Sequence, residues 1–281
     1  MENTKISNIC KTELILGYQL TKQRCEYNLG YIQAASDKGI RENQEDSVII
    51  LEHPKDSNIK LLAVADGVGG EQNSELASNE TLKELTIFFE TTPANYFNDS
   101  EYINYALDKK IEEINTDIHN KHIGCTTLSI AIVTKKETLI RNIGDSRVYT
   151  YNKGLKQETT DDSYVQRRYE EGSIREKDLM RFHRWSNVIQ NAVGSAEDIK
   201  INNYTIPNDY EYLILTTDGV TDCLSDSSLE SVIRNNKESN LANTIVEQVL
   251  HSISFCHEGA DYQKEIKGGK DNTTCAVLKR K

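Results

Sequence analysis

The sequence predicts an α+β protein in four layers, in which two mostly antiparallel sheets lie between two pairs of helices. Two observations lead to this fold class. Apolar, β-branched runs of strand length and helical segments follow the order strands, helix pair, strands, helix pair, strand. The first two helices are long and apolar along one stripe only, so a sheet or another helix must cover that stripe. Layering helix, sheet, sheet and helix is the economical way to cover it.

Strand-like segments occur in three parts of the chain. A β-rich block covers residues 30–65. Residues 127–133 alternate leucine and isoleucine with threonine, serine and alanine, which is typical of a half-buried strand. Two further strands surround Asp145, another ends at Asp218, and the last covers residues 272–278. We expect these segments to build the two sheets.

Helical segments are expected between the strands. The first helix begins with Ser74 as its cap, and the second begins with Ser100. Their apolar positions recur every three or four residues, at Leu76, Leu82, Leu85 and Phe89 in the first and at Ile103, Leu107, Ile111, Ile114 and Ile118 in the second. Two later segments, at about 228–235 and 242–256, form the second pair.

A long irregular segment separates the middle strands from the later ones. Residues 153–205 are polar and rich in both charges, with short helical patterns at 164–171 and 176–182. No low-complexity linker divides the chain. We therefore expect one domain at residues 29–281, preceded at residues 1–28 by a leader or an extra strand.

The composition excludes several classes of protein. The net charge of −11 argues against sequence-independent nucleic-acid binding, which needs clustered lysine and arginine. No apolar stretch approaches about 18 residues, so no transmembrane helix is expected, and the N-terminus lacks the pattern of a secretory signal. The six cysteines show no CxxC pairing, which indicates reduced thiols in a cytoplasmic protein. Nothing in the sequence demands more than a monomer.

Acidic residues stand at alternating ends of five apolar runs. Three runs lead into Asp66, Asp145 and Asp218, and two runs follow Glu45-Asp46 and Asp271. In antiparallel neighbours the end of one strand lies beside the start of the next, so these acids can gather along one sheet edge. So many carboxylates would repel one another unless cations lay between them. The sequence therefore predicts a metal cluster.

The chemistry of the candidate ligands narrows the choice of metal. All are hard oxygen donors without accompanying histidine or cysteine, which favours Mg²⁺ or Mn²⁺ over zinc or copper. Glycine follows Asp66 and Asp218, and without a side chain the Gly67 carbonyl can approach a cation. Arg41 precedes the first acids and can bind phosphate oxygens. An isolated Asp-Gly is usually only a turn, and an arginine near acids is usually a surface ion pair. The joint pattern favours the metal site.

Six motifs, in order, resemble those of the metal-dependent serine/threonine protein phosphatases, the type 2C phosphatases. They are RxxxEDS at 41–47, DGxGG at 66–70, GxTT at 124–127, NxGDSRxY at 142–149, DGxxD at 218–222 and DN at 271–272. One motif alone is weak, whereas six with compatible spacing, from about residue 29 to 279, are specific. The family fold is a β-sandwich with paired helices on both outer faces, which agrees with the layers expected above.

The resemblance implies a role for each acid. Two Mn²⁺ or Mg²⁺ ions would be held by Asp66, Asp218, Asp271 and the carbonyl of Gly67, and would be reached directly or through water by Glu45 and Asp46. A weaker third ion would be held by Asp145, Asp218 and Asp222. The catalytic residues implied are Asp66, Asp218 and Arg41, of which Arg41 would bind the substrate phosphate.

The resemblance also implies an activity. Phosphoserine and phosphothreonine monoesters would be hydrolysed by a water that bridges the metals, without a covalent enzyme intermediate. The partners would be phosphorylated proteins, the targets of serine/threonine kinases. Val68 stands where eukaryotic members carry a histidine thought to protonate the leaving group, so the general acid is unassigned.

The sequence leaves some alternatives open. Residues at about 155–203 would correspond to the flap beside the site, and five arginines there could steer a phosphorylated substrate: Arg167, Arg168, Arg175, Arg181 and Arg184. They could equally form an exposed face balanced by Glu170, Glu171, Glu176 and Asp178. An inactive pseudophosphatase that acts as a binding module would be expected to lack a ligand, and none is missing. A two-metal nuclease would need a basic groove, and the acidic net charge argues against one.

Overall fold

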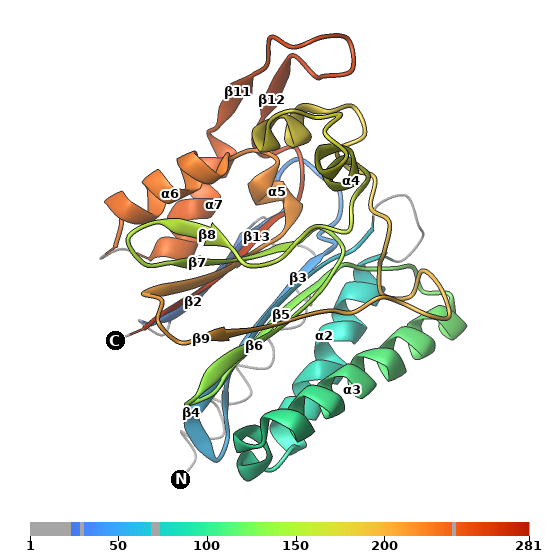
Figure 1. Cartoon of the computed structure of the whole chain (residues 1–281), viewed down its shortest axis with the longest axis vertical. Helices are drawn as coiled ribbons and strands as arrows, with labels where there is room; N and C mark the ends of the chain where they lie inside the picture. Colours follow the sequence, from blue (N-terminus) through green and yellow to red (C-terminus); the bar gives the residue numbers. More distant parts are fainter. Residues whose placement is uncertain (1–23, 29–30, 69–73, 238–239, 281) are drawn as a thin grey trace.

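The computed structural model describes residues 24–28, 31–68, 74–237 and 240–280 (Figure 1). Residues 1–23 of the expected leader and residues 69–70 of the DGxGG motif lie outside this part of the chain. No helix within the described ranges is long and apolar enough to cross a membrane.

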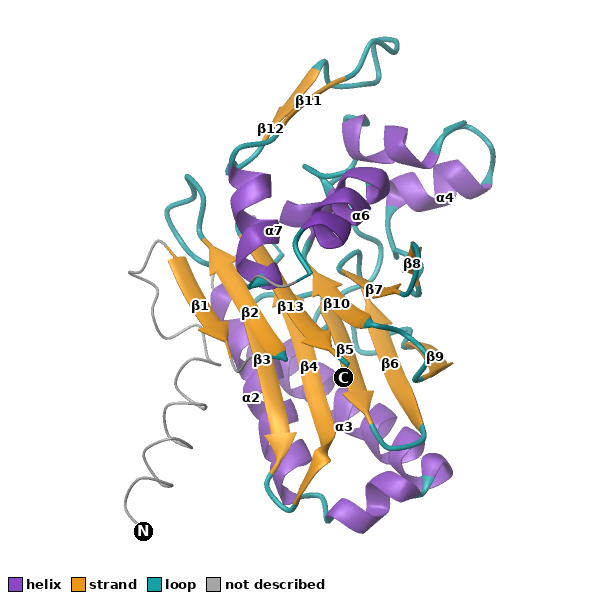
Figure 2. Ribbon diagram, turned by 90° about the vertical axis from the view of Figure 1, so that its left-hand side faces the viewer, coloured by secondary structure: helices purple, strands orange, loops and turns teal. Residues whose placement is uncertain are grey.

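Two antiparallel sheets form the centre of the molecule (Figure 2). The first has six strands, in the order β1 (Arg24–Asn28), β2 (Ile32–Asp37), β13 (Thr273–Lys279), β10 (Tyr212–Thr216), β7 (Arg147–Tyr151) and β8 (Leu155–Gln157). The second has five strands, in the order β3 (Asp46–His53), β4 (Asp56–Asp66), β5 (Leu128–Val133), β6 (Glu137–Ile143) and β9 (Asn202–Pro207). Every pair of neighbouring strands is antiparallel. β1 lies in the segment at residues 1–28, for which the sequence allowed either a leader or an extra strand.

Helices cover the outer face of each sheet. The five-stranded sheet is covered by α2 (Ser74–Thr91) and α3 (Ser100–Lys121), with the 3-10 turn η1 (Ala94–Asn98) between them. The six-stranded sheet is covered by α5 (Asp218–Thr221), α6 (Asp226–Asn235) and α7 (Leu241–Leu250). The predicted four-layer α-β-β-α sandwich is confirmed.

Strand β4 shows why the chain folds into layers. Leu61 and Ala63 belong to the core beneath α2 and α3, whereas Leu62 and Val64 belong to the core between the two sheets. Successive residues of a strand point to opposite faces. A strand covered on both faces must therefore be apolar at every position, which explains the unbroken apolar run at 61–65.

The segment between β8 and β9, residues 158–201, is called the flap below. It contains α4 (Tyr164–Glu170) and the 3-10 helix η2 (Lys177–Phe182), close to the expected helical patterns. Val165, Ile174 and Met180 form a small apolar cluster of their own within it. The flap is therefore a packed unit rather than an unstructured loop.

Two predictions about the first helix pair are wrong. The cap of α3 is Asp99, whose side chain accepts a hydrogen bond from the N–H of Tyr102, and Ser100 is the first helical residue. Both residue types cap helices, and a carboxylate gains further from the helix dipole. Leu76, expected on the buried face of α2, is 43% exposed.

The end of the second helix pair also differs from the prediction. The helix expected at about 242–256 ends at Leu250, and the chain continues into a hairpin of β11 (Ile253–Phe255) and β12 (Glu265–Lys267). Strands of three residues are too short to give a recognisable periodicity. The hairpin projects beyond the layers beside the flap (Figures 1 and 2), and residues 253–267 are called the arm below.

Truncation of single leucines should distinguish the two faces of α2. Leu82 is completely buried, so Leu82→Ala should lower the free energy of unfolding by about 2–5 kcal/mol through the cavity it leaves. Leu76→Ala in the same helix should change it by less than about 0.5 kcal/mol, because that side chain is exposed. Urea unfolding followed by circular dichroism measures both values. Equal losses in the two variants would contradict this orientation of the helix.

Candidate active site

The hairpin of β3 and β4 brings the first acids together. β3 starts at Asp46 and β4 ends at Asp66, and these two residues are paired directly across the strands. The N–H of Gly67 donates to the carbonyl of Glu45 at 3.1 Å. A Cβ on Gly67 would lie 2.7 Å from the carbonyl oxygen of Ser74, so only glycine permits this close approach.

Asp218 and Asp271 lie at the corresponding edge of the six-stranded sheet. β10 and β13 are antiparallel neighbours, so the residues that follow β10 lie beside those that precede β13. Asp218 begins α5 at this point. A Cβ on Gly219 would lie 1.9 Å from the carbonyl oxygen of Asn272, so the turn into α5 also requires glycine.

Hydrogen bonds join the two sheets at this edge. The hydroxyl of Thr217, after β10, donates to Oδ2 of Asp46 at 2.9 Å. The N–H of Glu45 donates to Oδ1 of Asn272 at 2.7 Å, and the amide of Asn272 donates to the carbonyl of Asn43 at 3.0 Å. The acids at the start of β3 are thereby fixed beside those of the other sheet.

Burial and mutual repulsion raise the pKa values of the gathered carboxyl groups. The pKa of Asp46 is raised to about 8, mainly by burial and further by the charges of Asp218 and Asp271. The pKa of Asp66 is raised well above its usual value by burial and by Asp218 and Asp46. Burial likewise raises the pKa values of Asp218 and Glu45. An opposite charge is needed before these groups can all be ionised together.

Asp145 and Asp222 extend the cluster. Asp145 lies in the turn between β6 and β7, after Gly144 with φ of +96°. Its pKa is raised well above the usual value by burial and by the charges of Asp218, Asp161 and Asp222. Burial and Asp218 likewise raise the pKa of Asp222. Asp145, Asp218 and Asp222 all line one small cavity.

The donor set fits a hard divalent cation. Oδ1 of Asp46 is buried without a hydrogen-bond partner, although Oδ2 has one. A buried oxygen without a partner is costly, and a cation would satisfy it. The surrounding donors are oxygens, which Mg²⁺ and Mn²⁺ prefer. Among the described residues, no three histidine, cysteine, aspartate or glutamate side chains are close enough together to hold an ion as they stand.

Arg41 lies at the exposed side of the cluster. Its Nη2 donates to Oδ2 of Asp271 at 2.6 Å, and the two side chains are 48% and 44% exposed. The residue belongs to the loop before β3, where Gly39 has a φ of +62° and the N–H of Ile40 donates to the carbonyl of Gly269 at 2.9 Å. The loop places the guanidinium against one of the candidate metal ligands.

Arg147 and Asp161 form an ion pair that was not predicted from the sequence. Nε and Nη2 of Arg147 donate to Oδ2 of Asp161 at 2.9 and 2.6 Å. The two side chains are only 14% and 3% exposed. The charge-assisted pair holds the start of β7, two residues after Asp145. The position of Arg147 in the NxGDSRxY motif was the feature of the sequence that could have indicated a role for it.

The flap arginines are largely paired with carboxylates. The ion pairs join Arg167 and Arg168 to Glu171, Arg181 to Asp178, and Arg184 to Asp261. This arrangement favours the balanced charged face over a cluster that attracts a phosphorylated substrate.

Comparison with known proteins identifies relatives along most of the chain. A family model for protein phosphatase 2C matches residues 32–254. The serine/threonine phosphatase stp of Listeria welshimeri is 28% identical over 256 residues, which cover 87% of this chain and 94% of that protein. The protein phosphatase PhpP of Streptococcus pneumoniae is 25% identical over 224 residues, which cover 78% of this chain and 85% of that protein.

Solved structures agree with this match. The serine/threonine phosphatase Stp1 from Staphylococcus aureus has a TM-score of 0.74 at 25% identity, covering 89% of this chain and 94% of that one. The phosphatase PstP/Ppp of Mycobacterium tuberculosis has a TM-score of 0.70 at 25% identity, covering 89% and 98%. The range matched by the family model contains every candidate acid except Asp271. The chain therefore belongs to the protein phosphatase 2C family and is a metal-dependent serine/threonine phosphatase.

Proposed function

We propose that this phosphatase hydrolyses phosphoserine and phosphothreonine monoesters of proteins at the edge where the two sheets bring their acids together. The observation that carries the proposal is the group of carboxyls with raised pKa values around the unpartnered Oδ1 of Asp46. Such a group is unfavourable unless cations share its charge. An inactive pseudophosphatase finds no support, because every candidate acid is present.

Each candidate ligand has a place in the proposal. Two Mn²⁺ or Mg²⁺ ions would be held by Asp66, the carbonyl of Gly67, Asp218 and Asp271, with Glu45 and Asp46 bound directly or through water. A weaker third ion would be held by Asp145, Asp218 and Asp222. When bound, the ions acidify a water molecule and offset the charge that develops on the phosphoryl oxygens. Thr217 and Asn272 would orient Asp46 and Glu45 through the hydrogen bonds that they already make.

Arg41 would bind the substrate phosphate. Its planar guanidinium presents several donors that match two phosphate oxygens at once. Its partner Asp271 is one of the proposed ligands, so the guanidinium lies beside the place where the phosphate would sit. Val68 offers no proton for the leaving group, and its N–H is bound to the carbonyl of Cys125 at 2.9 Å. We propose that water of the site supplies that proton.

The proposal also covers the setting of the enzyme. Its substrates would be targets of serine/threonine kinases rather than nucleic acids, in keeping with the net charge of −11. Cys223, Cys256 and Cys275 are free thiols, which is consistent with a reducing cytoplasm. We propose that the enzyme acts there as a monomer.

Removal of one ligand should abolish turnover. The protein should hydrolyse p-nitrophenyl phosphate and phosphothreonine peptides with Mn²⁺, and a chelator should stop both reactions. Asp218→Asn should lower kcat by at least about 100-fold, the scale seen when charge stabilisation at a reacting centre is lost. Asp117→Asn, an exposed change on α3, is the control and should keep full activity. Turnover in chelator, or none with millimolar Mn²⁺ in folded protein, would contradict the assignment.

Arg41→Ala should act chiefly on substrate binding. We expect KM for phosphopeptides to rise about tenfold with a smaller change in kcat, because a phosphate contact is lost while the acids remain. Arg234→Ala is the control, since Arg234 is 58% exposed on α6 and pairs with Glu230. Steady-state kinetics measures both constants. A variant of Arg41 that changed stability and neither constant would remove the arginine from phosphate binding.

Cation binding should be visible without any substrate. Saturating Mn²⁺ should stabilise the protein, by about 2.7 kcal/mol at a concentration 100 times the dissociation constant. Asp222→Asn should melt at a higher temperature than the parent in chelator, because the amide is not repelled by the neighbouring carboxylates, and should gain less from Mn²⁺. Differential scanning calorimetry measures both shifts. An unchanged Mn²⁺ shift in Asp222→Asn would exclude this residue from the metal site.

A further inference from the structure

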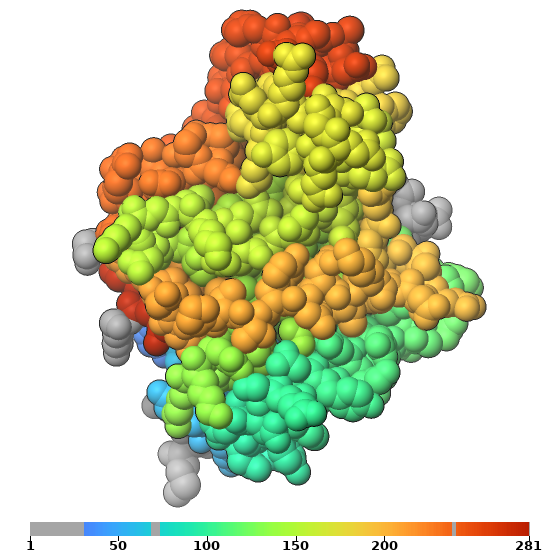
Figure 3. All heavy atoms as spheres, viewed as in Figure 1, coloured from blue at the N-terminus to red at the C-terminus, as the bar shows by residue number. Residues whose placement is uncertain are grey.

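The arm is joined to the flap through the backbone. The N–H of Gln263 donates to the carbonyl of Phe182 at 2.7 Å, and the N–H of Arg184 donates to the carbonyl of Asp261 at 2.9 Å. Figure 3 shows the arm, in red, seated against the flap, in yellow. Two segments about 80 residues apart in sequence thus form a short antiparallel bridge.

Side chains reinforce this contact. The rings of His183 and Tyr262 meet edge to face, with their centroids 5.6 Å apart. On its other side His183 lies 6.0 Å from the ring of Tyr164 in α4. Nη2 of Arg184 lies 3.3 Å from Oδ1 of Asp261. His183 is buried by these neighbours, so the arm and the flap are packed against each other and do not merely meet at the surface.

The base of the arm is fixed to the body of the protein. The N–H of Gly268 donates to the carbonyl of Ser252 at 3.0 Å, and a Cβ on Gly268 would lie 1.6 Å from the carbonyl oxygen of Val249. The hydroxyl of Ser254 donates to the carbonyl of Cys223 at 3.4 Å. An arm anchored at its base can hold the flap in a defined position.

The inner side of the flap reaches the acid cluster. Nη1 of Arg181 donates to the carbonyls of Asp222 and Cys223 at 3.2 and 3.3 Å. The carbonyl of Cys223 thus accepts hydrogen bonds from both the flap and Ser254 of the arm. Arm, flap and the candidate ligand Asp222 meet at this one turn.

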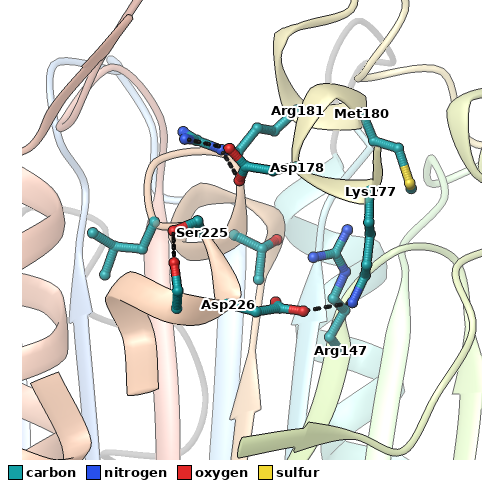
Figure 4. A pocket seen from close by; sticks show the side chains of 10 residues that line it. Arg147, Lys177, Asp178, Met180, Arg181, Ser225 and Asp226 are labelled. Carbon is teal, nitrogen blue, oxygen red and sulfur yellow. Dashed lines mark hydrogen bonds and ion pairs between the residues drawn. The ribbon is translucent and has the colours of Figure 1, made fainter. Parts of the chain in front are cut away.

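A cavity of about 320 Å³ lies between the flap and the start of α6 (Figure 4). The flap contributes Lys177, Met180 and Arg181 to its wall. The last two also line the smaller cavity that contains Asp145 and Asp218, so the two cavities adjoin. The volume lies within the range of clefts that bind small ligands, roughly 300–1,000 Å³.

The cationic side chains on the wall of this cavity are already paired, and Arg147 has Asp161 as its partner. Lys177 lies 2.6 Å from Oδ2 of Asp226, and Nε of Arg181 lies 2.8 Å from Oδ1 of Asp178, as Figure 4 shows. A second phosphate would have to displace these carboxylates. A side chain of a polypeptide, which combines apolar and hydrogen-bonding atoms, fits such a wall better.

We propose that the arm positions the flap for protein substrates. Asp261 and Tyr262 act through Arg184 and His183 to hold the flap, and the cavity behind it receives a residue that flanks the phosphorylated side chain. Asp261 and Tyr262 are positioning residues, since neither lines the cavity of the acids. The inference rests on the proposed hydrolysis of phosphoproteins. A small phosphoester has no flanking residue, so its hydrolysis does not depend on the arm.

The test compares two aromatic truncations in the same arm of the full-length protein. Tyr262→Ala should raise KM for a phosphothreonine peptide roughly three- to tenfold, as expected for loss of one aromatic contact. Its kcat and KM for p-nitrophenyl phosphate should stay at the parental values. Phe255→Ala is the control, because that side chain is 65% exposed, and it should change neither substrate. Tyr262→Phe keeps the ring and should restore the parental KM.

Hydrogen exchange supplies a readout that needs no turnover. The amide hydrogens of Arg184 and Gln263 should exchange faster in Tyr262→Ala than in the parent or in Phe255→Ala. If Tyr262→Ala fails to fold, Asp261→Ala tests the same junction through an exposed ion pair and should shift both readouts in the same direction.

The possible outcomes separate this inference from the proposed function. An unchanged peptide KM in Tyr262→Ala, or an equal loss on both substrates, would overturn the positioning role. If the parent hydrolysed neither substrate, the proposed function would fall. The exchange measurement would then still decide whether the arm holds the flap, and unchanged exchange would overturn that as well.

Discussion

Carboxyl groups that repel one another at a buried edge constrain the rest of this structure. Burial raises the pKa of Asp46 to about 8 and also raises those of Asp66 and Asp218. Such a group keeps in the folded protein a proton that the unfolded chain releases above pH of about 4. Its contribution to stability therefore falls as pH rises from about 4 towards 8. A bound cation opposes this loss, because ligation requires the ionised form and releases the proton. If these carboxylates hold the cations as proposed, folding and metal binding are linked through the same groups.

The antiparallel sandwich suits this constraint. Antiparallel pairing brings strand exits beside strand entries, so one edge collects Asp66 from one sheet and Asp218 from the other. Stacked sheets are held mainly by apolar side chains, which do not by themselves fix the alignment of their edges. Thr217 and Asn272 fix it here through hydrogen bonds that cross from one sheet to the other. Uncharged residues therefore help to set where the charged ones meet.

The sequence predicted what depends on local pattern and missed what depends on distant contacts. Apolar runs that end in an acid located Asp66 and Asp218, and the same runs predicted the layers because strands buried on both faces are apolar throughout. Asp99 and Ser100 are adjacent, and both residue types cap helices, so the sequence alone does not tell which of them is the cap. The path by which the chain enters the helix decides it. The arm has strands too short for a periodic signal, and its contacts lie with the flap, far away in sequence. The links made by Thr217 and Asn272 were invisible for the same reason.

The proposed role of Arg41 requires one residue to serve both the site without substrate and the site with bound phosphate. Its guanidinium pairs with Asp271, which the proposal assigns to the cations. An exposed pair of this kind is worth roughly 0–1 kcal/mol, so exchanging it for another anion costs little. If a cation shared the charge of Asp271 as proposed, the attraction between the two side chains would weaken, and a phosphate would become the stronger partner for the planar donors. The flap residue Arg181 is held by Asp178 and by two backbone carbonyls, so it has no comparable freedom to follow a phosphate. In the proposed mechanism, phosphate recognition therefore belongs to Arg41 and recognition of the polypeptide to the flap.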